Sequence, residues 1–218
     1  LDMRYSMGLA IFSLQMQNDA SITDGQIMKI EDLEGYTWSP DFPHPPLEDL
    51  AIFMGVDPAI SEKQEADFFA IAVIGIHNSR DIYVLDMFKG KLSFNRQLEV
   101  ILKMVRQWNP ERVGIEAVAY QRALAQAVKE FAFMPTVQEV MTRTDKTQRA
   151  RVFSAFVERH EVHFRYDMID AMNCLVGMPN VDHDDEFDAV DIATEAAKAT
   201  VLARTMVAVM PTNLRKRA

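Results

Sequence analysis

The fold is built on the stretch Ala51-Ile52-Phe53-Met54-Gly55-Val56-Asp57, which Pro58 follows. A short apolar run that stops at an Asp-Pro pair predicts a strand buried on both faces. We therefore expect Asp57 to be the last residue of a central strand.

Two further apolar runs follow at residues 68–76 and 82–88, each after a short polar connection. Three strands joined in this way predict an antiparallel meander. Beyond them the pattern alternates between helix and strand, which predicts a mixed sheet with helices on both faces. We expect helices over 94–108, 120–131, 146–160 and 169–176, strands over 112–117 and 136–141, an extended piece at 162–164, and a last helix that runs from the acids near 184 to about 201.

The N-terminal part of the chain differs from the rest in composition. Residues 39–46 hold four prolines, which favour irregular extended chain, and residues 6–18 could form one short helix or strand. We expect a linker or arm over 1–46, a domain over 47–204 and a tail over 205–218. Because the first residue is Leu1 and not Met, we expect a piece of a longer protein with a domain missing upstream.

Composition sets broad limits on the function. Cys174 is the single cysteine, which excludes an internal disulfide framework and a thiolate zinc cluster, and suits a reducing, cytosolic setting. No apolar run approaches the ~20 residues that span a membrane. The net charge of −9 disfavours nucleic acid as a partner, but residues 141–165 hold six basic residues against three acidic ones, and residues 182–191 hold six acids and no base.

The acids at 183–189 form the densest charge cluster, in the sequence His183-Asp184-Asp185-Glu186-Phe187-Asp188-Ala189. On a helix, Asp184, Asp185 and Asp188 share one face and repel each other. Either the positive end of the helix or a bound cation must offset that repulsion, and an acid-rich first turn is the commoner case. A neighbouring narrow face, suited to close packing on a sheet, is formed by Ala189, Ile192, Ala193, Ala196 and Thr200.

Two acids at strand ends favour the cation. Asp57 and Glu116 each end an apolar strand, and on neighbouring strands their carboxyl groups would lie about 5 Å apart. The last helix then has only to bring Asp185 or Asp188 over them. Oxygen ligands of this kind suit two Mg²⁺ or Mn²⁺ ions and not zinc, and such a pair of ions hydrolyses phosphodiesters.

Basic residues would hold the polyanionic substrate. Lys146, Arg149 and Arg151 lie on or next to one predicted helix, where they could contact DNA phosphates without reading the base sequence.

Five motifs in this order resemble the nuclease domain of the large terminase subunit of tailed bacteriophages, a ribonuclease H-like nuclease. They are Gly55-Val56-Asp57-Pro58-Ala59, Asp67-Phe68-Phe69-Ala70, Ile115-Glu116, Asp145-Lys146-Thr147-Gln148-Arg149-Ala150 and the acid cluster of residues 183–189. The resemblance covers residues 47–203. Residues 10–18 are similar to the segment that joins the family's ATPase motor to its nuclease.

The resemblance implies an endonuclease that cuts concatemeric double-stranded DNA into genome lengths during packaging, in the cytoplasm of the infected bacterium. It implies that Asp57 bridges two metal ions, that Glu116 ligates one and Asp185 the other, and that Asp188 is a second helix acid. Asp184 would assist from behind the ligands, His183 would cap the helix or support the ligands, and Asp67 could equally be a turn residue. The implied partners are an upstream ATPase domain, the small terminase subunit and the portal protein, with no membrane.

Three other functions remain open at this point. A Holliday-junction resolvase of the same fold would use similar acids, although the proline-rich arm disfavours a compact free-standing dimer. The chain could also be a docking module that binds DNA or a partner without cutting. A sugar-kinase-like ATPase needs glycine-rich phosphate loops, and this chain has eight glycines without such a cluster, nor does it contain the phosphate-binding loop that DNA translocation requires.

Overall fold

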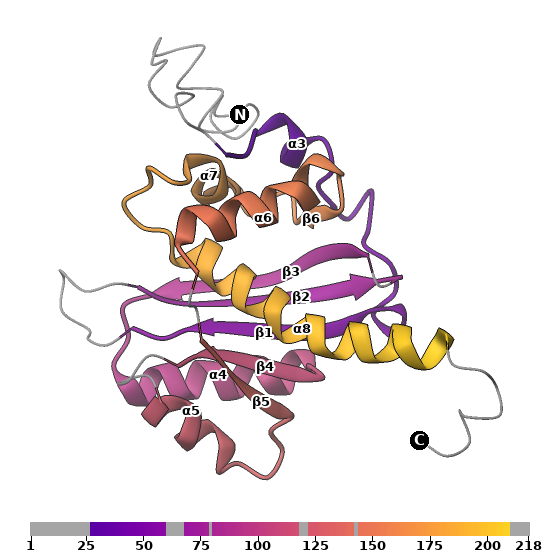
Figure 1. The fold of residues 1–218 in the computed structure, drawn as a ribbon. Coiled ribbons are helices and arrows are strands. Elements are labelled where there is room, and N and C mark those ends of the chain that lie inside the picture. Colours follow the sequence, from indigo (N-terminus) through magenta and orange to yellow (C-terminus); the bar gives the residue numbers. More distant parts are fainter. Residues whose placement is uncertain (1–26, 60–67, 79, 118–121, 142–143, 210–218) are drawn as a thin grey trace.

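A six-stranded mixed sheet forms the centre of the described residues (Figure 1). The structure is a computed structural model that describes residues 27–59, 68–78, 80–117, 122–141 and 144–209. The strands lie in the order β5-β4-β1-β2-β3-β6. Their bounds are β1 Ala51–Asp57, β2 Phe69–His77, β3 Asp81–Gly90, β4 Arg112–Glu116, β5 Thr136–Val140 and β6 Val162–Phe164.

The pairing confirms the predicted fold class. β1, β2 and β3 form the antiparallel meander, and β4 and β5 continue the sheet as parallel strands on the other side of β1. The extended piece predicted at residues 162–164 is a sixth strand, β6, which pairs in parallel with β3.

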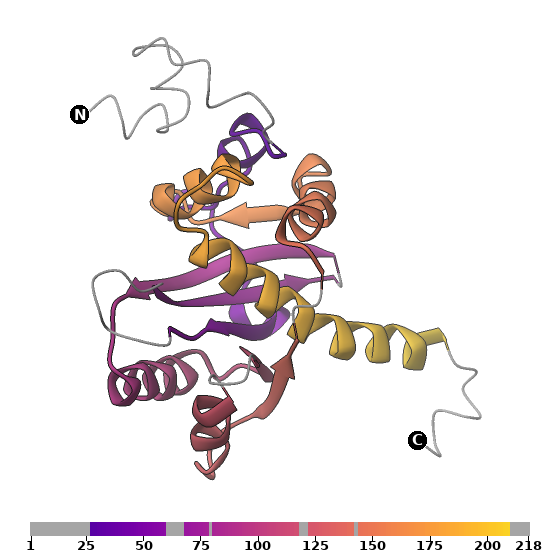
Figure 2. The same cartoon turned by 60° about the vertical axis from the view of Figure 1, so that its left-hand side comes forward.

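Helices cover both faces of the sheet, as the two views show (Figures 1 and 2). Strand β1 alternates between the two layers: Met54 and Val56 pack with α4 (Phe94–Trp108) and α5 (Arg122–Lys129), whereas Phe53 packs in the opposite layer. That opposite layer holds α6 (Lys146–Glu158), α7 (Ile169–Gly177) and α8 (Asp185–Val209). None of the described helices is long and apolar enough to cross a membrane.

Helix α8 lies unusually close to the sheet because two glycines face it. A Cβ atom on Gly55 would stand 2.1 Å from the carbonyl oxygen of Ala189 and 2.3 Å from the amide nitrogen of Ala193. A Cβ atom on Gly114 would stand 3.0 Å from the carbonyl oxygen of Ile192. The narrow helix face predicted from the sequence is therefore the face that packs on β1 and β4.

Part of the predicted N-terminal arm packs on the domain. Met28, Ile30 and Leu33, in and before the short helix α3 (Glu31–Glu34), are buried against the layer of α6 and α7. The indole N–H of Trp38 donates a hydrogen bond to the carbonyl oxygen of Val84 at 3.0 Å. The sequence predicted a linker over residues 1–46 because prolines at 40–46 interrupt any regular pattern there. The short 3-10 turn Leu47–Asp49 leads into β1, and the boundary at residue 47 stays a prediction.

Several predicted features lie outside the described residues. They are the element at 6–18, the terminase-like segment 10–18, Asp67 and the last part of the tail, 210–218.

Candidate metal centre

The ends of β1 and β4 bring two acids together. The parallel register pairs Gly55 with Gly114 and Val56 with Ile115, so Asp57 and Glu116, the next residues, lie side by side. Each acid lies two positions after a glycine that faces α8, and side chains two apart on a strand share a face. Asp57 and Glu116 therefore point toward the layer of α8.

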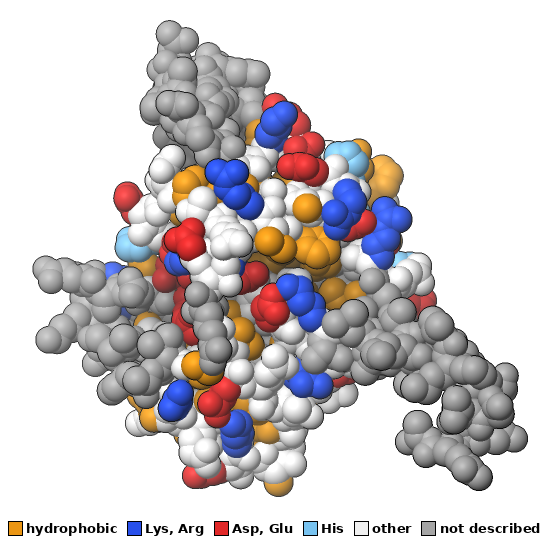
Figure 3. All heavy atoms as spheres, viewed as in Figure 1, with side chains coloured by type: hydrophobic (Ala, Val, Ile, Leu, Met, Phe, Trp, Pro, Cys, Tyr) orange, Lys and Arg blue, Asp and Glu red, His pale blue; other side chains and the backbone are white. Residues whose placement is uncertain are grey.

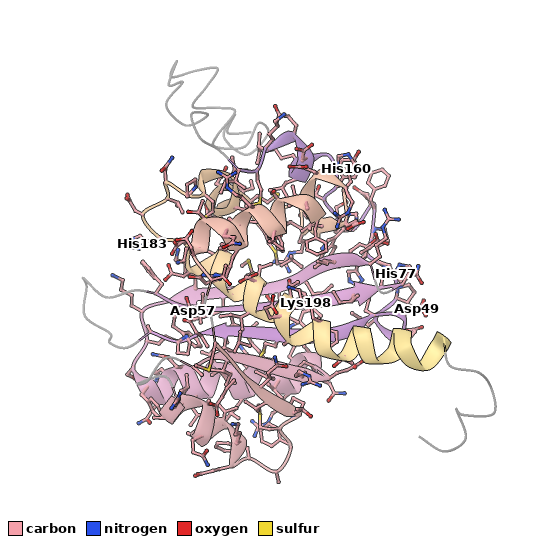
Figure 4. The ribbon with its side chains drawn as sticks, viewed as in Figure 1. Asp49, Asp57, His77, His160, His183 and Lys198 are labelled. Carbon is pink, nitrogen blue, oxygen red and sulfur yellow. The ribbon has the colours of Figure 1, made fainter. Side chains whose placement is uncertain are left out.

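The first turn of α8 lies over this strand edge. Because the backbone of Ala189 touches Gly55, the residues just before Ala189 reach the end of β1. Figure 4 shows Asp57 at the end of its strand close to where the helix begins. The acids on this part of α8 are buried: Asp185, Glu186, Asp188 and Asp191 each expose 9% or less of their surface. Buried carboxylates need charge partners, because burial removes their hydration.

Asp57 has the environment of a cation site. Burial raises its pKa well above the ordinary value, and the negative charges of Asp188, Glu116 and Asp185 raise it further, in that order, together with a hydrogen bond shared with Glu116. A carboxyl group among three others is stabilised by a proton or by a bound cation. Asp188 comes before Asp185 in the order of these charge effects on Asp57. The sequence left open which of the two helix acids lies closest, and the resemblance assigned the second ion to Asp185.

Helix α6 supplies cations to the α8 acids. The Lys146 ammonium lies 2.7 Å from Asp184 Oδ2 and 2.6 Å from Asp188 Oδ2. The Arg149 guanidinium lies 2.9 Å from Asp188 Oδ1 and 2.6 Å from Asp191 Oδ2. Burial raises the pKa of Asp188 above its ordinary value even though both cations act to lower it. Two of the three residues predicted to hold DNA are thus occupied by acids of the same chain.

The third predicted DNA contact, Arg151, has a different environment. Its side chain is exposed on α6, five positions after Lys146 and two after Arg149. Arg151 is therefore the member of the trio that faces solvent.

The strand side of the centre contains residues that sequence reasoning missed. The Phe68 backbone N–H donates a hydrogen bond to Asp185 Oδ1 at 3.1 Å. The Lys89 ammonium lies 3.2 Å from Asp185 Oδ2 and 2.6 Å from Glu186 Oε2. Phe68 directly precedes β2, and the sequence marked it only as part of the motif Asp67-Phe68-Phe69-Ala70. Nothing local in the sequence marks Lys89, because it lies on β3 and reaches the acids only through the fold. Asp191 could have been identified from the sequence, because it follows Asp188 by three positions and so shares its helix face.

His183 lies beside the cluster. Its ring meets the Phe68 ring edge to face at 5.0 Å, and its carbonyl oxygen accepts a weak hydrogen bond from the Cys174 thiol at 3.7 Å. Helix α8 begins two residues later, and the carbonyl oxygen of Asp184 accepts the hydrogen bond of the Asp188 N–H at 3.0 Å. These contacts place His183 in a supporting position against Phe68.

The donor set fits a hard divalent cation after a rearrangement of side chains. Among the described residues, no three Asp, Glu, His or Cys side chains already stand as a metal-binding group. The helix acids instead contact Lys89, Lys146 and Arg149. Asp185 Oδ2 is buried without a hydrogen bond of good geometry, and its nearest charge is the Lys89 ammonium at 3.2 Å. Four carboxyl groups supply the oxygen atoms that Mg²⁺ and Mn²⁺ prefer.

Comparisons with known proteins agree with the fold. The family model of the terminase RNaseH-like domain matches residues 54–197. The curated proteins contain no match.

Solved structures share the fold at low sequence identity. The human cytomegalovirus terminase nuclease domain is 13% identical, with a TM-score of 0.56 over 80% of this chain and 96% of that one. The large terminase nuclease of the thermophilic phage G20c, with bound magnesium, is 12% identical, with a TM-score of 0.57 over 78% and 96%. The HK97 bacteriophage large terminase is 9% identical, with a TM-score of 0.59 over 78% of this chain and 43% of that chain.

Proposed function

The chain belongs to the family of terminase ribonuclease H-like domains, and on this premise we propose that it is a metal-dependent endonuclease. It cuts concatemeric double-stranded viral DNA during genome packaging. The observation that carries the proposal is the convergence of Asp57, Glu116, Asp185 and Asp188 at one sheet edge, with the pKa of Asp57 raised by burial and by its three neighbours.

The four acids would divide the metal ligation between them. Following the resemblance, Asp57 would bind both ions, Glu116 would bind one, and Asp185 or Asp188 would bind the other. Asp184 and His183 would support these ligands from behind. Two bound Mg²⁺ or Mn²⁺ ions would supply an activated water and stabilise the leaving oxygen of the phosphodiester.

The substrate and partners follow from the family. We propose duplex DNA cut with little sequence preference, because nothing in the described structure resembles a base-reading module. The solved relatives were described with magnesium, and in other crystals with manganese or zinc, which supports a divalent ion here. The nuclease would occupy residues 47–204 with a tail over 205–218, and would work in the cytoplasm of the infected bacterium with an upstream ATPase domain, the small terminase subunit and the portal protein.

Plasmid cleavage tests the proposal. With Mn²⁺, the chain should convert supercoiled plasmid to linear DNA and then to fragments without one unique cut site. Asp57→Asn should lower the rate by about a hundredfold or more, since a metal site supplies several kcal/mol of transition-state stabilisation.

Asp49→Asn is the matched control, because Asp49 is exposed just before the opposite end of β1. It should cut like the parent. A parent chain that binds DNA but never cuts it with Mn²⁺ or Mg²⁺ would favour the docking module. Equal cutting by Asp57→Asn would disprove the metal centre.

A further inference from the structure

Lys89 stands where a metal ion would meet Asp185. Its ammonium lies 3.2 Å from Asp185 Oδ2 and 2.6 Å from Glu186 Oε2, at the end of β3 beside the first turn of α8. We propose that Lys89 is a built-in competitor of the divalent ion: it holds Asp185 in the metal-free protein and must withdraw to Glu186 before Asp185 can ligate metal. This inference rests on the proposed metal centre.

The two contacts of Lys89 differ in kind. With Glu186 it makes a short, charge-assisted hydrogen bond at 2.6 Å. Asp185 Oδ2 stands farther from the ammonium, at 3.2 Å, and its contact with Lys89 lacks good hydrogen-bond geometry. Charge-assisted hydrogen bonds are the stronger class. Lys89 can therefore release Asp185 and keep Glu186.

Phe68 organises both sides of this competition. Its backbone N–H donates a hydrogen bond to Asp185 Oδ1 at 3.1 Å. The other oxygen, Oδ2, is then the one that Lys89 contacts and that a metal ion would bind. Its ring lies under the Lys89 ammonium, 4.8 Å from the ring centre. Aromatic faces attract ammonium groups, so Lys89 keeps a favourable environment on the Glu186 side.

The ammonium group has room to move. A cavity of about 410 Å³ opens beside Lys89 and is lined also by Glu186, Asp167 and Asp170. Asp167 pairs with Arg165, whereas Glu186 and Asp170 add negative charge that favours a cation there. An ion at Asp185 would repel Lys89 toward this cavity, because like charges a few ångströms apart repel strongly in a partly buried site.

The consequence is a threshold for metal binding. In the metal-free protein Lys89 reduces the repulsion among the buried acids, and the hydrogen bond and charges of Glu186 and Asp185 keep its pKa raised despite burial. A divalent ion has to overcome this charge, so the centre fills at a higher ion concentration than four free carboxylates would require.

Metal titration without DNA tests the competition. Isothermal titration with Mn²⁺ should give a Kd about tenfold lower for Lys89→Met than for the parent, the size expected for one group beside a metal site. Lys89→Arg retains the charge and should keep a Kd near the parent value. Lys91→Met is the matched control, because Lys91 lies over the same ring at 4.6 Å, and its Kd should change less than twofold.

Glu186→Gln provides a second test with the opposite sign. Without Glu186, Lys89 would pair with Asp185 alone, so Mn²⁺ binding should weaken. If Lys89→Met folds poorly by circular dichroism, Glu186→Gln alone still tests the inference, and Mn²⁺ binding by Glu186→Gln that equals the parent's would overturn it. If Lys89→Met folds, the weakening caused by Glu186→Gln should be smaller in the double variant.

The outcomes separate this inference from the proposed function. If Lys89→Met binds Mn²⁺ more weakly than the parent, Lys89 positions Asp185 for the ion. If Lys91→Met changes the Kd as much as Lys89→Met does, the effect comes from the loss of any nearby positive charge. Either would overturn the competitor and leave the nuclease standing. A parent that binds no Mn²⁺, or Asp57→Asn that binds it equally well, would instead disprove the metal centre itself.

Discussion

Asp57 shows at the residue scale how a functional site strains a fold. Its carboxyl group ends a buried strand and lies among Asp188, Glu116 and Asp185. In the metal-free protein this arrangement is unfavourable, because the charged form lacks both water and a cation. A divalent ion bound at the proposed centre would make the same arrangement favourable.

We predict that Asp57→Asn stabilises the metal-free protein while it abolishes metal-dependent cleavage. The raised pKa means that the folded protein holds this proton more tightly than the unfolded chain, so stability falls as the pH rises above about 4, the ordinary pKa of Asp. Asn has no carboxyl group that ionises, so the variant does not lose this stability as the pH rises. In EDTA at pH 8 the Tm should rise, by about 2–4 °C for each kcal/mol gained, and the gain should shrink toward pH 4.

Thermal unfolding across this pH range measures the effect. Asp49→Asn should leave the Tm unchanged at every pH, because Asp49 is exposed. A variant with a Tm below that of the parent at pH 8 in EDTA would contradict the repulsive environment.

Cys174 gives a second prediction at this scale. Burial raises the pKa of its thiol to about 12, and the nearby charge of Glu186 acts in the same direction. Only the thiolate reacts with alkylating agents. At pH 8, iodoacetamide should therefore modify the native protein more than about a hundredfold more slowly than the urea-unfolded chain. Mass spectrometry of timed samples checks this, and equal rates would mean that α7 does not bury the residue.

Helix α8 is the element on which the site depends. It carries Asp185 and Asp188 on its first turn and packs on β1 and β4 through a face of small residues. The acids can reach Asp57 only because Gly55 lets the two backbones approach. Close packing of the helix and clustering of the acids are thus two consequences of one contact.

We predict that Gly55→Ala separates this element from the sheet. The new methyl group would lie 2.1 Å from the carbonyl oxygen of Ala189, a backbone atom that cannot turn aside. Overpacking of this kind costs about 1–3 kcal/mol or more of unfolding free energy, and Mn²⁺ affinity should fall with it. Urea unfolding and metal titration measure both effects.

Gly35→Ala is the control for the loss of glycine itself. A Cβ atom there would meet its nearest neighbour, the carbonyl oxygen of Glu31, at an ordinary 3.4 Å. Its stability should stay close to that of the parent. If Gly55→Ala were equally mild, α8 would not lie on β1 as described.

The whole molecule is acidic, with a net charge of −9. Blue and red side chains lie interspersed on the face seen in Figure 3. Lys146 and Arg149 are already paired with acids of α8, so these two cations are less available to phosphates. We therefore expect the chain alone to bind DNA weakly, with affinity falling as salt rises.

Arg151→Gln tests where the duplex is held. Each phosphate contact adds about 0.9 to the slope of log affinity against log salt concentration, so the variant should show a slope less steep by about that amount. The loss should be the same for DNA of any sequence, because phosphates carry no base information. Fluorescence anisotropy of labelled DNA at salt concentrations from about 50 to about 200 mM measures this slope.

Lys103→Gln is the control for the loss of one positive charge. Lys103 is exposed on α4, in the layer on the other face of the sheet. Its salt slope should match that of the parent. An identical change in both variants would mean that net charge, and not a contact on α6, controls binding.

Local patterns in the sequence predicted much of the architecture. The apolar runs, the turn residues and the helical spacing identified β1 to β5 and helices α4 to α8, since each of these signals lies within a few neighbouring residues. The strand-end positions of Asp57 and Glu116 followed from the same runs. The narrow face of α8 followed from its run of small residues. The buried part of the N-terminal arm escaped this reading, because its apolar residues pack only against distant helices.

The sequence by itself therefore determined the order and type of the elements and the acids that each one carries. The tertiary structure alone decided what meets those acids: that Lys146 and Arg149 pair with α8, and that Lys89 contacts Glu186 from 97 positions away along the chain. Contacts over such distances depend on which strands become neighbours and how closely a helix approaches them. No local pattern encodes them, and they are the contacts that set the charge of the candidate metal centre.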